Sequence, residues 1–191
     1  MARQINRVSE AFTRWRLRIA READVPAIEK LIALSVRGLQ ADYYSASQME
    51  AALGSVFGVD RQLIRDGTYY VVEQQGELIG CGGWSKRKTL FGSDHQTNRD
   101  DTEINPESDP ARIRAFFIHP AWARRGIGRA ILDECERAIR VAKFKSIELA
   151  ATLPGVPFYA ACGYVAGQRS DVPLPNNLSL QIVRMTKTFQ P

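Results

Sequence analysis

Residues 112–142 read RIRAFFIHPAWARRGIGRAILDECERAIRVA, and this stretch decides the fold. A nearly unbroken apolar run at residues 113–118 predicts a central strand that is covered on both faces. A turn with two glycines follows, and beyond it apolar residues recur at helical spacing as far as Ala142. We therefore expect one unit of strand, turn and helix, in which the strand ends at Pro120 and the helix begins at Gly128.

The turn in this unit is typical of an anion-binding site. Backbone N–H groups at a helix N-terminus point outward and carry the positive end of the helix dipole, so they can surround a phosphate where the side chains are small. Gly126 and Gly128 leave that room. Arg124, Arg125 and Arg129 add positive charge. The sequence therefore predicts that this turn binds a phosphate group.

Two motifs carry a resemblance to a known family. The strand end His119-Pro120, followed by RRGIGRA at residues 124–130, resembles the acyl-CoA pyrophosphate loop of the GNAT N-acetyltransferase superfamily. The segment FYAACGY at residues 158–164 resembles the C-terminal motif of the same family. The motifs stand in the family's order with one helix and one strand between them, which is more specific than a glycine turn alone. The resemblance covers residues 15–188.

The resemblance implies a fold. It predicts an α/β (α+β) protein with a single-domain GNAT-like fold, in which a mixed, mostly antiparallel sheet of about six to seven strands has helices on both faces. The central parallel strand pair would be splayed to admit CoA. We expect residues 1–191 to form a single N-acetyltransferase domain, with a basic N-terminal extension at residues 1–13 and a long polar loop at residues 86–110.

The resemblance also implies where acetyl-CoA, as cosubstrate, would bind. The turn would hold the pyrophosphate mainly through backbone amides. The main chain of Phe117 and Ile118 would hold the pantetheine arm, and a backbone N–H there would face the thioester oxygen. Ala123 stands where the family has Gln or Arg, so that side-chain contact is absent. The expected cofactor-binding residues are Phe117, Ile118, Arg124, Arg125, Gly126, Ile127, Gly128, Arg129 and Ala130.

Tyr159 matches the family's catalytic tyrosine, which protonates the departing CoA thiolate. A phenol with a pKa of about 10 is protonated at neutral pH and can donate to a sulfur anion. The alternative is that Tyr159 is a packed aromatic residue on a short helix. Thr152 and Gly155 stand where many family members have Asn and Ala. Tyr159 is therefore the candidate catalytic residue.

The sequence does not choose a general base. Some family members carry a glutamate on the central strand, and Arg112 stands at that position here. Histidine is a common general base, but His119 precedes a proline at a strand end, where a residue is more often structural. Cys162 has no base beside it in the sequence, and the family transfers its acyl group directly. The remaining candidates, which would act through a water, are His95, Glu103, Glu107 and Asp109.

Length and composition limit the classes of protein to which this chain can belong. The chain has 191 residues, of which 45% are hydrophobic and 25% charged, as is typical of a single soluble globular domain. No apolar run approaches the roughly 20 residues that cross a bilayer, and the N-terminus lacks the apolar core of a signal peptide. The three cysteines lie far apart in the sequence, which fits free thiols better than a metal site. We expect a cytoplasmic protein with no metal and no membrane partner.

The positive charge is concentrated at the N-terminus. The net charge is +5, and residues 1–21 hold six arginines against one glutamate, so the rest of the chain is neutral. The positive charge therefore lies in an extension and does not line a groove, so we expect no nucleic acid partner. A homodimer is compatible with the sequence.

The remaining segments predict the elements around the central unit. Residues 86–110 are polar and precede the central strand, so this loop is either disordered or functional, for example as a cover over an acceptor mouth. Patterning predicts helices at residues 3–13, from Asp24, at 60–66 and at 155–161, and a capping box at 47–50. It also predicts a hairpin at 68–85, a Pro-rich turn at 171–177, and strands at 14–19, 146–151, 164–168 and 178–189.

The leading hypothesis is an acetyl-CoA-dependent N-acetyltransferase in which a primary amine attacks the bound thioester directly, within a ternary complex. The alternative is an acyl-CoA-binding module without turnover, because the strand glutamate is missing. The sequence names neither the acceptor nor the length of the acyl chain.

Overall fold

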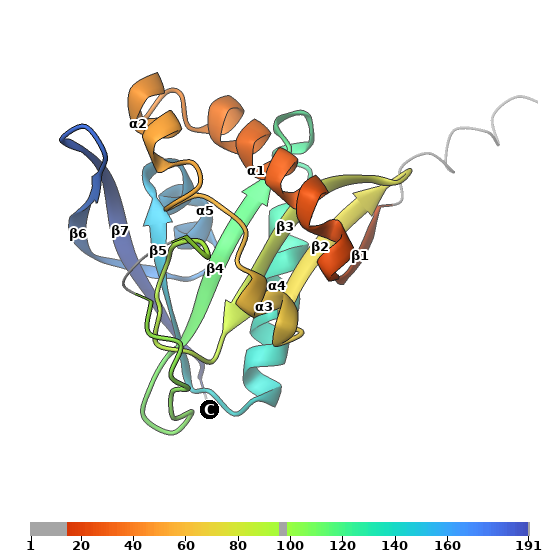
Figure 1. Cartoon of the computed structure of the whole chain (residues 1–191). Helices are drawn as coiled ribbons and strands as arrows, with labels where there is room; N and C mark the ends of the chain where they lie inside the picture. Colours follow the sequence, from red (N-terminus) through yellow and green to blue (C-terminus); the bar gives the residue numbers. More distant parts are fainter. Residues whose placement is uncertain (1–14, 96–98, 191) are drawn as a thin grey trace, which may run out of the picture.

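A computed structural model describes residues 15–95 and 99–190 of the chain (Figure 1). The strands are β1 (Arg16–Ile19), β2 (Tyr69–Gln74), β3 (Glu77–Ser85), β4 (Ala111–Ile118), β5 (Ser146–Thr152), β6 (Val165–Leu174) and β7 (Leu178–Thr188). The helices are α1 (Val25–Leu39), α2 (Ala46–Ala52), α3 (Arg61–Arg65), α4 (Ile127–Val141) and α5 (Val156–Ala161). Short 3-10 turns lie at Glu22–Asp24, Pro120–Trp122 and Leu153–Gly155.

The strands form one sheet in the order β1-β2-β3-β4-β5-β7-β6. β4 and β5 run parallel, and every other neighbouring pair is antiparallel. Figure 1 shows α1, α2 and α3 on one face of the sheet and α4 and α5 on the other. The predicted fold, a mixed and mostly antiparallel sheet with helices on both faces, is confirmed.

Each face of the sheet has its own core. On one face α4 buries Ile131, Cys135 and Ile139 completely against the strands. On the other face α1 buries a stripe that includes Ile28 and Leu31. Each fully buried aliphatic side chain contributes about 1.5–3 kcal/mol relative to an exposed one. The two helices are therefore held firmly where they meet the end of β4.

The parallel ladder between β4 and β5 is short. It pairs Ala111 with Ile147 and ends where Ile113 pairs with Leu149. Just beyond that point β4 contains a bulge, because its register with β3 shifts, and Ala115 lies in the left-handed region with a φ of 53°. A bulge bends its strand, so β4 turns away from β5 over its carboxyl half. The splayed parallel pair that the sequence analysis expected is present.

Glycines in β3 make room for this arrangement. A Cβ on Gly82 would lie 2.4 Å from Cδ2 of Phe116, and a Cβ on Gly80 would lie 2.7 Å from Cγ2 of Ile127. Contacts that short are not tolerated, so both positions require glycine. The side chains that approach Gly80 and Gly82 closely come from α4 and β4.

The predicted start of α2 was wrong. The capping box expected at residues 47–50 lies two positions earlier, because Ser45 is the N-cap. The N–H of Gln48 donates to Ser45 Oγ at 3.2 Å, and the N–H of Ser45 donates to Gln48 Oε1 at 2.9 Å. Both serines have a suitable residue three positions on, and the local pattern did not distinguish them.

The predicted end of β6 was also wrong. The strand extends to Leu174, through part of the turn expected at residues 171–177. Pro173 is tolerated because β6 is an edge strand, where a missing N–H costs no ladder hydrogen bond. The actual turn is tight and contains Asn176 and Asn177, whose φ angles are 60° and 56°.

The other boundaries agree with the sequence analysis within a few residues. α4 begins at Ile127 with Gly126 as its N-cap, slightly before the expected start at Gly128. The helix expected at residues 3–13 lies outside the described residues. Among the described residues, no helix combines the length and the apolar character needed to cross a membrane.

The long polar loop is tied to the rest of the molecule through polar contacts. Arg87 pairs with Asp66 at 2.7 Å. Arg99 pairs with Asp60 at 3.1 Å, and Ser93 Oγ donates to the carbonyl of Gly54 at 2.6 Å. The described parts of the loop, residues 86–95 and 99–110, therefore have defined partners on the α3 side of the sheet.

Candidate active site

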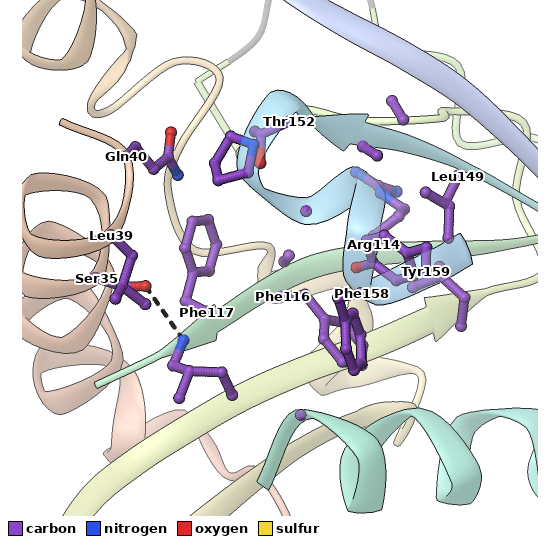
Figure 2. Close-up of a pocket in the computed structure, with 18 of the residues that line it drawn as sticks. Ser35, Leu39, Gln40, Arg114, Phe116, Phe117, Leu149, Thr152, Phe158 and Tyr159 are labelled. Carbon is purple, nitrogen blue, oxygen red and sulfur yellow. Dashed lines mark hydrogen bonds between the residues drawn. The ribbon is translucent and has the colours of Figure 1, made fainter. Parts of the chain in front are cut away.

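A cavity of about 690 Å³ opens where β4 and β5 separate (Figure 2). Its walls come from the end of α1, the carboxyl halves of β4 and β5, the first turn of α4, and α5. Residues 56–58 and residues 90–92 line it as well. The loop that the sequence analysis proposed as a cover for an acceptor mouth therefore reaches this cavity.

The first turn of α4 lies at one end of the cavity. Gly126 caps the helix in the left-handed conformation with a φ of 84°, and the N–H of Ala130 donates to its carbonyl at 3.0 Å. The N–H groups of Ile127, Gly128 and Arg129 have no acceptor within the helix. A Cβ on Gly126 would meet nothing within 4 Å. The turn therefore offers unpaired donors, the positive end of a helix dipole, and space beside them.

The three arginines of the turn differ in their surroundings. Arg124 and Arg129 line the cavity. Arg129 also pairs with Asp133 at 2.8 Å, at an exposed position. The guanidinium carbon of Arg125 lies 4.9 Å from the centroid of the Trp122 ring, as in a cation–π contact. The turn therefore carries positive charge, part of which already has partners.

Two of the expected cofactor-binding residues contribute less than the sequence suggested. Ile127 is 1% exposed, so only its backbone is available. The N–H of Ala130 is already donated to Gly126. The donors of this turn therefore come from residues 127–129.

The pairing of β4 with β3 determines which main-chain N–H and C=O groups of β4 face the cavity. The N–H of His119 donates to the carbonyl of Ile79 at 3.0 Å. Because polar groups alternate along an antiparallel strand, Phe117 also faces β3, opposite Cys81, while Ile118 faces away from it. The N–H of Ile118 donates to Ser35 Oγ of α1 at 3.2 Å (Figure 2). Of the two residues expected to contact a bound arm through the main chain, only Ile118 presents its polar groups to the cavity side.

Tyr159 lines the cavity from α5 and is 8% exposed. Its ring makes edge contacts with those of Phe116, Phe158 and Tyr164, at centroid distances of 6.3, 5.0 and 5.7 Å. Burial raises the pKa of Tyr159 well above the usual value for a phenol. No described residue forms a hydrogen bond with its hydroxyl. Tyr159 is thus both a packed aromatic residue and a protonated phenol at the cavity wall.

No aspartate, glutamate or histidine is among the described residues that line this cavity. The base candidates of the sequence analysis have other partners. Nδ1 of His119 accepts the N–H of Ala121 at 3.2 Å, which makes it a helix cap. Glu103 pairs with Lys86 at 2.7 Å. The structure therefore places none of these groups at the cavity.

The other base candidates are likewise not among the described residues that line the cavity. Glu107 pairs with Lys145 at 2.5 Å. Asp109 accepts the N–H of Asn105 at 2.8 Å, and His95 lines a separate pocket. Cys162 is buried, and burial raises its pKa, which argues against a thiolate nucleophile. Within the described residues, no group of three His, Cys, Asp or Glu side chains could hold a metal ion.

The cavity also contains polar residues that the sequence analysis did not single out. Ser35 and Gln40 come from the end of α1, and Arg114 comes from β4. The available signal was an arginine, Arg114, within the apolar run of the central strand. Its partner, Asp60, is distant in the sequence and completely buried. Only the folded structure brings them together.

Comparisons with solved structures show that the fold is widely shared. A GCN5-related N-acetyltransferase from Rhodopseudomonas palustris is 23% identical, with 91% of this chain and 95% of that chain covered and a TM-score of 0.67. The PaiA N-acetyltransferase from Thermoplasma acidophilum, solved in complex with coenzyme A, is 13% identical, with 92% and 99% covered and a TM-score of 0.64. A GNAT family acetyltransferase from Brucella melitensis, solved in complex with acetyl-CoA, is 16% identical, with 93% and 90% covered and a TM-score of 0.56.

Among curated proteins, none matches the chain significantly. The family model described as the acetyltransferase (GNAT) domain matches residues 65–166, which is more than half of the chain. That range contains both motifs on which the resemblance depends, the turn before α4 and the segment around Tyr159. The chain therefore belongs to the GNAT acetyltransferase family.

Proposed function

We propose that this protein is an acetyl-CoA-dependent N-acetyltransferase that moves the acetyl group directly from the CoA thioester to a primary amine in a ternary complex. The observation that carries the proposal is that the anion-binding turn of α4 and Tyr159 line one cavity, where β4 and β5 separate. Two solved structures with this fold are described as complexes with coenzyme A or acetyl-CoA, which supports a CoA ester as the donor.

In this proposal the turn holds the diphosphate of acetyl-CoA. The N–H groups of residues 127–129 donate to its oxygens, and Arg124 and Arg129 add charge at the same end of the cavity. The pantetheine arm follows β4 toward Ser35. Acetyl-CoA supplies an activated acyl group, and residues of this chain bind and orient it.

Ser35 and Ile118 provide polar groups where the arm would pass. Ser35 is 4% exposed, and its Oγ accepts the N–H of Ile118. A serine hydroxyl can accept one hydrogen bond and still donate another, so Ser35 can donate to a carbonyl oxygen in the cavity. We propose that this pair polarises a carbonyl of the bound donor, either on the arm or at the thioester.

Tyr159 is the proposed general acid. In direct transfer a bond forms between the amine nitrogen and the acyl carbon, and the carbon–sulfur bond breaks. Tyr159 then gives its proton to the departing thiolate and later regains one from solvent. The raised pKa of Tyr159 keeps the phenol protonated at neutral pH, as an acid requires. The amine reaches the site neutral, and after its attack the positively charged nitrogen loses a proton to water, because the described lining of the cavity contains no carboxylate or imidazole.

The same lining favours one alternative, an acyl-CoA-binding module without turnover. A cavity without a base could bind an acyl-CoA and leave it intact. The two functions differ in thiol release, since only the enzyme frees CoA when an amine is present.

Two measurements test the proposal. Isothermal titration calorimetry measures the binding of CoA, and a thiol-release assay with acetyl-CoA and a panel of primary amines measures turnover. We expect both to be positive. Binding without thiol release from any amine supports the binding module. No heat at millimolar CoA contradicts both functions, because the turn then does not bind the nucleotide.

A further inference from the structure

Arg114 is a buried cation at the wall of the cavity. Its side chain is 1% exposed, and Nη2 lies 2.5 Å from Oδ2 of Asp60 and donates to the carbonyl of Gly92 at 3.1 Å. Nε and Nη1 have no hydrogen-bond partner among the described residues. Buried donors on a charged group are costly to leave unpaired, so these two N–H groups indicate a missing acceptor.

The charge of Arg114 is only partly balanced. Asp60 is shared, because Oδ1 of the same carboxylate pairs with Arg99 at 3.1 Å. Asp60 therefore serves two guanidinium groups, of which Arg99 also pairs with Asp101 at 3.1 Å. Burial lowers the pKa of Arg114 and the neighbouring Arg99 lowers it further, while Asp60 raises it. An additional anion beside Arg114 would stabilise this cluster.

The cavity around Arg114 is otherwise apolar. On the α1 side its walls are aliphatic and aromatic, and they are formed by Leu39, Val56, Phe57, Leu90 and Phe91. Figure 2 shows Gln40 at the end of α1 with its amide directed toward the cavity. Gln40 is 6% exposed, and its Oε1 is buried without a hydrogen-bond partner among the described residues. The cavity therefore combines apolar walls with one unpaired acceptor, at Gln40, and one partly unpaired cation, at Arg114.

We propose that the acceptor is a small amine that carries a carboxylate and an apolar body, such as an apolar amino acid or an aminobenzoate, and that Arg114 binds the carboxylate. This inference rests on the proposed acetyltransferase function. Nε and Nη1 of Arg114 each carry an N–H without a partner, and an N–H on a charged guanidinium can donate a strong hydrogen bond to a carboxylate oxygen. Polyamines and aminoglycosides are disfavoured, because they need acidic residues that the described lining lacks.

The test compares matched acceptors in the thiol-release assay with acetyl-CoA. Phenylalanine is set against phenethylamine, and 4-aminobenzoate against aniline, at a pH where each amine is neutral. We expect the carboxylate to raise kcat/KM by roughly 10- to 100-fold, as for a charge-assisted bond. Equal or better turnover of the amines without a carboxylate overturns the inference but leaves the acetyltransferase function intact.

Arg114→Lys is the informative variant, because it keeps a positive charge beside Asp60 but loses the planar fork. We expect KM for the carboxylate acceptor to rise about tenfold, with little change in CoA binding or in turnover of the matched amine. The control is Arg112→Lys on the same strand, because Arg112 pairs with Glu148 and lies outside the cavity lining. An equal effect in both variants assigns Arg114 a structural role and contradicts the proposal.

A binding measurement covers the case in which Arg114→Lys does not fold or no amine is acetylated. N-acetylphenylalanine and N-acetylphenethylamine are titrated into the wild-type protein in the presence of CoA. Preferential binding of the carboxylate compound supports the inference independently of turnover. Equal binding, or binding of neither compound, overturns it. CoA binding in the same experiment shows separately whether the donor site is functional.

Discussion

Ile113 of β4 and Leu149 of β5 form the last pair of the parallel ladder, and they are also the first residues of their strands to line the cavity. Arg114 and Ala115 follow Ile113 directly, at the bulge that bends β4 away from β5. A single local distortion therefore opens the gap between the strands and places a buried arginine at its edge. In the proposed function, the path of the donor and the recognition of the acceptor both depend on this point.

Gly126→Ala tests the anion-binding turn. Alanine at a φ of 84° is strained, so we expect a loss of about 1 kcal/mol in unfolding free energy. The new Cβ would also enter the open space beside the unpaired N–H groups, so CoA affinity should fall about tenfold. Chemical denaturation and calorimetry with CoA measure the two effects.

Gly76→Ala is the matched control for this variant. Gly76 has a φ of 85° and equally open surroundings, but it lies in the turn between β2 and β3. It should lose similar stability and bind CoA as the wild type does. If Gly126→Ala binds CoA with wild-type affinity, the diphosphate does not sit at this turn.

Tyr159→Phe separates the enzyme from the binding module. The hydroxyl has no hydrogen-bond partner among the described residues, so its removal should leave the unfolding free energy unchanged or slightly increased. Turnover should fall by roughly 100-fold or more, as expected for a positioned acid, while CoA binding persists. Steady-state thiol release and calorimetry check this. Unchanged turnover removes Tyr159 from the mechanism.

The pH dependence of kcat/KM should follow the pKa of the acceptor amine. The described cavity lining contains no carboxylate or imidazole, so kcat/KM should rise with pH until the acceptor amine itself is neutral. Acceptors with different amine pKa values should shift the rising limb accordingly. The pKa of Tyr159 is raised, and the phenol acts in its protonated form, so no fall due to its ionisation is expected below about pH 10. A rising limb at one fixed pH for every acceptor would instead indicate a base on the protein.

Much of the fold could be predicted from local patterns. The helical stripe of Ile131, Cys135 and Ile139 is buried as its spacing indicated, and the apolar run of β4 forms a central strand. The cap of α2 was missed because Ser45 and Ser47 both fit the capping pattern, and only packing chooses between them. Local patterns predict elements well where one face is strongly apolar, and they predict boundaries less well.

The site was partly predictable for a different reason. The turn before α4 and Tyr159 belong to compact motifs, so their sequence alone predicted where they would lie. Arg114 lies in no such motif. Its role depends on its pairing with Asp60, which precedes α3 and which only the fold brings beside it. In the proposed function, the residues that would bind the donor are therefore visible in the sequence, while those that would surround the acceptor required the structure.

Asp24→Asn tests the contacts that anchor the start of α1. Arg18 binds the Asp24 carboxylate through two nitrogens, at 2.7 and 2.9 Å, and the N–H of Arg21 donates to it at 2.8 Å. These contacts, led by the hydrogen bond from Arg18, lower the pKa of Asp24. A lowered folded-state pKa means that the stabilisation is present at neutral pH and is lost as pH falls through that pKa. We expect the variant to lose about 1–3 kcal/mol at pH 7.

The difference between wild type and Asp24→Asn should therefore shrink as the pH falls from about 5, and urea denaturation at a series of pH values measures it. Glu22→Gln is the control, because Glu22 pairs with Arg61 at 3.0 Å at an exposed position, where an ion pair contributes little. That variant should remain near wild-type stability at every pH. A deficit in Asp24→Asn that stays constant down to the lowest pH would show that the contacts act through packing and not through the charge of the carboxylate.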